Sequence, residues 1–155
     1  MTDPMDEQET PAPLQLLPSR MLSLVAMHAD RLVSDGLARA DARKWHYAAL
    51  VALREKGPMS QAELSRRTGI YRSDLVAVIN ELAERGFVKR TPDAADRRRN
   101  VVTVTPQGRR HLQRLHKLIS ELQEDLLAPL TGPERERFTD SLARLLSHHS
   151  GRGTP

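Results

Sequence analysis

Apolar residues recur at three- and four-residue steps along most of the chain, and this spacing predicts amphipathic helices. One apolar stripe begins at Leu17, and we expect its helix to stop near Gly36. A second helix should begin after Asp41, whose carboxylate can cap it, and should end at Gly57. The first third of the chain is therefore predicted to contain two helices.

Two shorter helices are predicted between Ser60 and Gly86. Ser60 and Glu63 have the spacing at which a hydroxyl and a carboxylate each bond a free backbone N–H at a helix start. Gly69 should end this helix, and an apolar stripe through Leu75 marks the next one, which Gly86 should end. The pair is thus separated by a short turn.

The spacing changes after residue 86. Residues 87–91 and 100–105 are rich in β-branched side chains and are joined by a segment that begins Pro92-Asp93, which predicts a two-stranded hairpin. Thr105 and Gly132 then open two longer helices. The fold class is mostly α with a small β-hairpin, and three helices followed by a hairpin are typical of a winged helix-turn-helix.

The charge is unevenly placed. The net charge is +4, but residues 85–117 hold ten Lys or Arg against only Asp93 and Asp96, which favours a polyanionic partner. No cysteine is present, so disulfides, thiolate metal sites and thiol redox sensing are excluded. The acidic N-terminal segment has no signal-peptide pattern and no apolar run reaches membrane-span length, so we expect a cytoplasmic protein with no membrane partner.

The basic run Arg97-Arg98-Arg99 lies at the predicted hairpin tip. In a winged helix the hairpin, or wing, reaches along the duplex, where permanently charged guanidinium groups suit the narrow minor groove. Asp96 can hold a neighbouring guanidinium in one rotamer. The alternative is a solvated turn without a partner; the helix-turn-helix directly upstream favours DNA contact.

These elements divide the chain into parts. We expect a disordered N-terminal tail at residues 1–13, dimerisation helices at 14–36 and 106–149, a winged helix-turn-helix DNA-binding lobe at 41–105, and a flexible tail at 150–155.

Three sequence motifs carry a family resemblance. They are ELxxxxG from Glu63, LxxxGFVxR from Leu82, and DxR at Asp96 followed by VxVTxxG from Val102. Together they resemble the MarR (multiple antibiotic resistance regulator) family of bacterial transcription factors. The resemblance implies a homodimeric transcriptional regulator, a repressor in our prediction, that binds double-stranded DNA at a palindromic operator and is often released by a small molecule.

The chain departs from the family pattern at two positions. Asn80 stands where the family commonly has an aspartate that braces a wing arginine, so the resemblance implies weaker bracing here. Tyr71 stands where a serine often precedes the recognition helix, and it cannot cap with a short hydroxyl.

The candidate base-reading residues follow from the geometry of a recognition helix. Its first turn points at base edges, which selects Arg72 and Ser73. Arg72 can pair bidentately with guanine, and Val76 or Ala77, one turn on, can meet a thymine methyl group.

Other residues are expected to contact the DNA backbone. Ser60, Gln61 and Arg67 should lie near phosphates, with helix capping as the alternative for Ser60 and plain surface exposure for Arg67. On the wing, Arg98 is the residue expected to enter the minor groove, as the match to DxR implies. Arg97 and Arg99 should touch backbone, and Arg90 should either contact phosphate or pair with Asp93.

The outer helices carry apolar residues that a lone winged helix would leave exposed, which indicates an interface between two copies of the chain. Packing within one chain is the competing explanation for some of them. The candidate dimer residues are Leu16, Leu17, Met21, Leu130, Phe138, Leu142, Leu145 and Leu146.

An effector site is predicted from the family resemblance, which places a pocket between the dimer helices and the DNA-binding lobe. His28, Trp45, His46 and Tyr47 are the candidate ligand contacts, with a core role as the alternative for His28. The remaining histidines lack the three- or four-residue spacing of a helical metal site, so neither metal nor cofactor is expected.

Two other function classes were weighed. An enzyme would need a nucleophile with a placed base, paired acids or a phosphate-binding loop, and none is visible in the sequence. A winged helix that binds another protein, without sequence-specific DNA binding, is the alternative function.

Overall fold

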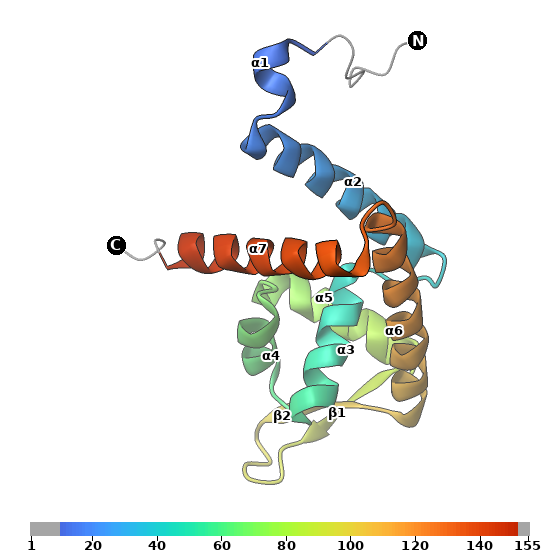
Figure 1. Cartoon of the computed structure of the whole chain (residues 1–155). Helices are drawn as coiled ribbons and strands as arrows, with labels where there is room; N and C mark the ends of the chain where they lie inside the picture. Colours follow the sequence, from blue (N-terminus) through green and yellow to red (C-terminus); the bar gives the residue numbers. More distant parts are fainter. Residues whose placement is uncertain (1–9, 152–155) are drawn as a thin grey trace.

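The computed structural model describes residues 10–151 and contains helices and one two-stranded antiparallel sheet (Figure 1). This arrangement confirms the predicted mostly helical winged fold. In chain order the elements are α1 (Ala12–Gln15), α2 (Pro18–Ala38), α3 (Lys44–Lys56), α4 (Gln61–Thr68), α5 (Arg72–Glu84), β1 (Val88–Pro92), β2 (Asn100–Val104), α6 (Pro106–Leu126) and α7 (Gly132–Ser150).

Several helix ends follow the chemistry predicted from the sequence. The Ser60 hydroxyl accepts the backbone N–H of Glu63 at 3.2 Å, and Gly69 ends α4 in the left-handed conformation, with φ of 73°. The Thr105 hydroxyl caps α6. The Glu63 carboxylate, however, does not complete a capping box and bonds Arg67 instead, because a guanidinium one turn away is a stronger donor than a backbone N–H.

The first helix stops near Gly36 as predicted, at Ala38, but Gly36 does not itself end it, and the predicted cap at Asp41 is wrong. Gly36 lies inside α2, which continues to Ala38; a Cβ at Gly36 would be 2.5 Å from the Leu122 methyl groups, so the glycine permits α2 and α6 to cross closely. Asp41 does not cap α3, because it adopts a positive φ of 51° before the helix starts. Arg43 is the cap position, and its N–H donates to Nδ1 of His46.

The ends of the chain also differ from the predicted tails. The short helix Ala12–Gln15 begins at Ala12, so residues 12 and 13 of the predicted disordered tail are helical. Ser150, expected in the flexible C-terminal tail, is the last residue of α7. Residues 1–9 and 152–155 lie outside the described part of the chain.

The core joins α3, α4, α5, the hairpin and the first half of α6, which we call the lobe (Figure 1). Its largest fully buried side chains include Leu50, Leu64, Leu75, Ile79 and Leu112. The hairpin pairs Val88 with Val104 and Pro92 with Asn100. Met59, just before α4, forms a further antiparallel bridge with Val102, so the wing is fixed to the helix-turn-helix through backbone bonds.

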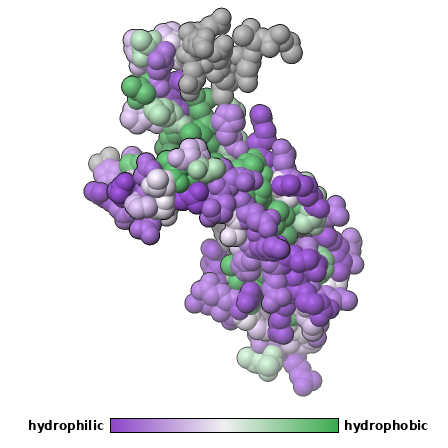
Figure 2. Space-filling model, turned by 45° about the vertical axis from the view of Figure 1, so that its right-hand side comes forward, coloured by the Kyte–Doolittle hydropathy of each residue, from purple (hydrophilic) through white to green (hydrophobic). Residues whose placement is uncertain are grey.

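The outer helices contrast with the lobe. We call α1, residues 18–35 of α2, and α7 the arms. Within residues 10–151, none of the arm residues is buried. Figure 2 shows apolar side chains gathered in the upper part of the molecule, whereas the lower lobe is mostly hydrophilic. In the described part of the chain, no helix is both long and apolar enough to cross a membrane.

Candidate nucleic-acid interface

The helix α5 has one buried and one exposed face. Leu75, Val78, Ile79 and Leu82 are fully buried against the lobe core. The opposite face is exposed, and it carries the residues predicted to read bases: Arg72, Ser73, Val76 and Ala77. These four side chains are therefore available to a groove of DNA.

The turn before α5 is rigidly held. Ile70 is buried, its carbonyl accepts the Ser65 hydroxyl at 2.5 Å, and its N–H donates to the Thr68 hydroxyl at 3.3 Å. Tyr71, the next residue, is 80% exposed at the start of the exposed face of α5. The sequence pattern marks Tyr71 only as a missing cap. Its apolar ring on a polar face was the signal that it belongs with the candidate interface.

Arg90 connects three elements of this surface. Its Nε donates to Oε1 of Gln61 in α4 at 3.1 Å, and its Nη2 donates to Oδ1 of Asn80 in α5 at 2.6 Å. The predicted alternative of an Arg90–Asp93 pair is wrong, because the Asp93 carboxylate accepts the N–H of Ala95 and so serves the loop itself. Asn80 braces Arg90 directly.

The wing tip is organised by Asp96. Its Oδ1 accepts the backbone N–H of Arg98 at 3.1 Å and the Nε of the same residue at 3.2 Å, and its Oδ2 lies 3.9 Å from Nε of Arg99. The Arg98 side chain nonetheless remains 91% exposed. Arg97 has no hydrogen-bond or ion-pair partner within residues 10–151. The tip thus presents guanidinium groups on a loop that is locally ordered.

Besides Gln61, the two other phosphate-contact candidates of this region, Ser60 and Arg67, also have structural partners. Ser60 caps the helix, which is the alternative role predicted for it. The Nε and Nη2 of Arg67 donate to one oxygen of Glu63 at 3.1 and 2.9 Å. The positive charge of Arg67 is therefore compensated by a carboxylate one helical turn away.

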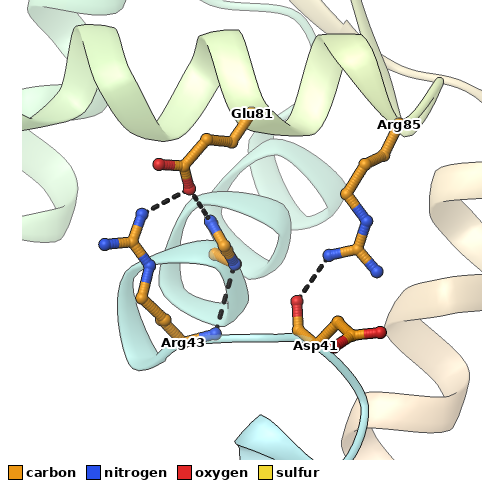
Figure 3. A network of polar contacts seen from close by, with 5 residues as sticks. Asp41, Arg43, Glu81 and Arg85 are labelled. Carbon is orange, nitrogen blue, oxygen red and sulfur yellow. Dashed lines mark hydrogen bonds and ion pairs between the residues drawn. The ribbon is translucent and has the colours of Figure 1, made fainter.

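A polar network fixes the far end of α5 (Figure 3). The Nε2 of His46 lies 2.6 Å from Oε2 of Glu81, which also bonds Arg43. Because Nδ1 of His46 accepts the Arg43 N–H, its Nε2 must be the protonated nitrogen that donates to Glu81. Burial lowers the pKa of His46, and the bond from His46 lowers that of Glu81. Nearby, Arg85 donates to the Asp41 carbonyl at 2.5 Å. The network connects the recognition helix to the segment between α2 and α3.

The four candidate ligand contacts do not share one pocket. Trp45 is 44% exposed and lines a surface hollow of about 380 Å³ together with Arg43 and Lys44. His46 is buried in the network with Glu81, and the Tyr47 hydroxyl lies 2.8 Å from Nδ1 of His116. His28 lines other hollows along α2. Trp45 and His28 therefore line separate surface hollows, whereas His46 and Tyr47 are engaged with other side chains.

The candidate dimer residues lie on the arms and on the connection between α6 and α7. Most are exposed in the single chain, with Leu130 and Leu142 only partly so. The packing of α1 and α7 within one chain does not cover them, so the competing explanation fails for most of the set. The exposed members are Leu16, Leu17, Met21, Phe138, Leu145 and Leu146.

Comparison with known proteins gives consistent findings. The sequence model of the MarR family matches residues 42–99. The HTH-type transcriptional regulator YcgE of Bacillus subtilis, itself uncharacterised, is 34% identical over 84 residues, which are 54% of each chain. The chain thus spans about half the length of this curated relative.

Two solved structures extend the likeness over most of the chain. A probable transcriptional regulator from Pseudomonas aeruginosa is 31% identical with a TM-score of 0.73, covering 85% of this chain and 98% of that one. The PcaV transcriptional regulator of Streptomyces coelicolor, in complex with its natural ligand, is 25% identical with a TM-score of 0.71, covering 89% and 97%. All three relatives are named as transcriptional regulators, in agreement with the expectation that the chain is not an enzyme.

Proposed function

The chain belongs to the MarR family, and on that premise we propose that it is a transcriptional repressor that binds a palindromic DNA operator as a homodimer. The observation that carries the proposal is the α5 surface, where Arg72, Ser73, Val76 and Ala77 form an exposed face on a helix whose other face is fully buried. A surface helix of this kind fits the major groove, and the basic wing beside it suits the DNA backbone and minor groove.

Each element then has a role. Arg72 and Ser73 contact base edges, while Val76 and Ala77 meet thymine methyl groups. Arg98 enters the minor groove, where negative potential is concentrated, and Arg97 and Arg99 contact phosphates. Tyr71, exposed next to Arg72, adds an apolar contact to sugar or base.

The arms form the dimer. Their exposed leucines and Phe138 would be covered by the same residues of a second copy, as a two-fold interface requires. Such a dimer places two recognition helices about 34 Å apart, one turn of duplex, which is why the operator should be palindromic.

The effector is an aromatic anion bound beside Trp45. The indole offers a stacking surface, and Arg43 and Lys44 in the same hollow offer N–H donors that an anion would share with their present partners, Glu81 and Asp30. PcaV has been solved with its natural ligand, so a relative of similar fold binds a small molecule. Because Arg43 also bonds Glu81 of α5, a ligand that draws Arg43 away would loosen the recognition helix.

Selection of DNA from a random pool tests the DNA-binding function. We expect enrichment of a palindrome, with affinity that falls by about 10³- to 10⁵-fold between 50 and 200 mM salt if six to ten phosphates are contacted. Arg72→Ala should cost about 1–3 kcal/mol and relax one base position per half-site, whereas Arg98→Ala should weaken binding most at A·T-rich flanks. If no DNA is enriched and both variants behave like the wild type, the chain is instead a protein-interaction module.

The effector is tested through Trp45, the only tryptophan in the chain. Salicylate-like acids and phenols are titrated while indole emission and operator binding are followed. We expect both signals to change at the same ligand concentration, and Trp45→Ala to lose the release from DNA. His28→Ala serves as the matched variant, because His28 lies outside the Trp45 hollow. Release that persists in Trp45→Ala would place the regulatory site elsewhere.

A further inference from the structure

Arg90 differs from the arginines that pair with carboxylates, because the groups that bond it carry no net charge. Five arginines of the described residues have a carboxylate within 4.0 Å, namely Arg43, Arg67, Arg98, Arg99 and Arg135. Arg90 has no carboxylate partner between residues 10 and 151, and its two bonds go to the side-chain amide oxygens of Gln61 and Asn80. An amide oxygen orients a guanidinium but carries no net charge. Arg90 is therefore fixed in place with its full positive charge uncompensated.

The bonds leave the remaining donors of Arg90 open to a ligand. A guanidinium has five N–H donors, and Gln61 and Asn80 take one from Nε and one from Nη2. Both hydrogens on Nη1 and the second on Nη2 remain, on a side chain that is exposed. Two parallel N–H groups of this kind match two oxygens of a phosphate.

The position of the cluster matches the candidate DNA surface. Gln61 is the first residue of α4, Asn80 lies on the exposed face of α5, and Arg90 is in the wing strand β1. One guanidinium thus joins the three elements that would meet the duplex. Exposed hydrogen bonds between neutral and charged groups contribute little to folding, so the stability of the lobe does not explain why they are present.

We propose that Gln61, Asn80 and Arg90 form a preassembled clamp for one backbone phosphate of DNA, in which two neutral amides orient the arginine and leave its charge for the ligand. The proposal rests on the DNA-binding function above. Arg90 is the phosphate-contacting residue, and Gln61 and Asn80 are positioning residues. Because its rotamer is fixed beforehand, Arg90 loses little side-chain entropy on binding. The clamp also predicts that Arg90 contributes more to phosphate binding than Arg67, whose charge Glu63 compensates.

The test replaces each amide by the carboxylate of the same shape. Gln61→Glu keeps an acceptor for Arg90 but places a negative charge beside it, so the phosphate contact should weaken although the arginine is held more firmly. Asn80→Asp makes the same change at the position where the family commonly has an aspartate, and the same loss is expected if this chain depends on a neutral amide there. We expect operator affinity at 100 mM salt to fall about tenfold or more, and the slope of log affinity against log salt to decrease by about one per lobe. Gln113→Glu, the same chemical change at an exposed site on α6, controls for net charge and should keep the slope.

Two further variants separate orientation from charge. Arg90→Lys keeps the charge but cannot bond both amides, and Asn80→Ala keeps Arg90 with one bond fewer; both should weaken binding a few-fold and preserve the salt slope. Thermal melting of every variant confirms that the lobe is folded.

The outcomes distinguish the clamp from the function on which it rests. If Asn80→Asp and Gln61→Glu bind the selected operator with the affinity and salt slope of Gln113→Glu, the clamp is overturned while DNA binding stands. If the wild-type chain enriches no DNA sequence and shows no salt-dependent binding, the proposed function and the clamp are both overturned.

Discussion

The lobe and the arms differ in whether their apolar side chains are buried within the chain. The lobe buries its apolar residues within one chain, around Leu50, Leu64, Leu75 and Ile79. The arms bury none of theirs, and α7 presents Leu145 and Leu146 to solvent at 49% and 68% exposure. A helix that keeps an apolar stripe without a core is completed by a partner. The lobe is therefore complete within one chain, whereas the arms leave apolar surface that the proposed homodimer would cover.

The largest effect is expected where the arms would meet a second copy. The double substitution Leu145→Glu and Leu146→Glu puts two carboxylates into the proposed interface but touches no buried residue of the lobe. We expect a monomer in sedimentation, and operator affinity reduced by about 10²- to 10⁴-fold because the two half-sites are no longer bound together.

Ser147→Glu on the opposite face of α7 is the matched control and should leave a dimer. If the double variant sediments as the wild type does, the α7 stripe is not the interface. A dimer contact through α7 then does not explain why the apolar residues of the arms are exposed.

A second prediction concerns a buried histidine of the lobe. His111 in α6 is only 2% exposed, and its ring stacks on Phe87 with 4.1 Å between centroids. Burial lowers its pKa to about 4, and the nearby Arg85 and Arg114 act in the same direction. As the pH falls from 6.5 to 4, the unfolded chain binds a proton that the folded chain does not, so the free energy of unfolding decreases, by about 3 kcal/mol at pH 4 from this group.

His111→Phe keeps the aromatic ring but cannot be protonated. It gives up the bond that Nδ1 accepts from Nη2 of Arg114 at 3.3 Å, whereas Nε2 has no hydrogen-bond partner in the described part of the chain. Urea unfolding at pH 7, 5.5 and 4 should show a flatter profile for this variant than for the wild type. His148→Gln, on the exposed surface of α7, should keep the wild-type profile. An unchanged profile in His111→Phe would mean that the ring is not kept neutral by burial.

The third prediction addresses the apolar contact at Gly36, where α2 crosses the second half of α6. A methyl group there would be 2.5 Å from the terminal carbons of Leu122, which is itself buried, so the leucine or the helices must shift. Gly36→Ala should lower the free energy of unfolding by about 1–3 kcal/mol through overpacking.

Combining Gly36→Ala with Leu122→Ala tests that mechanism, because the methyl group then has space and the two effects should not add. Gly132→Ala is the control, since among the described residues nothing beyond its chain neighbours and the backbone of its own helix lies within 4 Å of the position that its methyl group would take. Additive losses in the double variant would show that Gly36→Ala acts through the backbone at residue 36 and not through contact with Leu122.

Gly36 also illustrates what the sequence could and could not predict. Helix ends decided by local bonds were predictable, as at Gly69 and Thr105, because the residues that satisfy each end are within a few positions. Gly36 resembles the same signal, but its role depends on Leu122, far away in the sequence. A local sequence pattern cannot distinguish a glycine that ends a helix from one that allows a neighbouring helix to pack closely.

The candidate site likewise has residues that the sequence predicts and contacts that it does not. The exposed face of α5 follows from the helical period, so its candidate residues could be chosen from the sequence alone. The partner of Arg90 could not, because Asp93 is nearer in sequence and charged, whereas the fold brings Asn80 and Gln61 to it. The link between His46 and Glu81 depends likewise on the packing of α3 against α5, and no local pattern indicates it.

The smallest effect is expected at an ion pair between arm and lobe, where Lys44 of α3 pairs with Asp30 of α2. Both side chains are substantially exposed, so water and salt weaken their attraction, and ordering two flexible side chains offsets part of the gain. Asp30→Asn should therefore reduce the free energy of unfolding by less than about 1 kcal/mol, and the difference should shrink in 0.5 M salt. Lys44→Gln and the double variant complete a cycle that isolates the pair. A loss as large as that of Gly36→Ala would mean that charge, and not the close crossing of α2 and α6, holds the arm to the lobe.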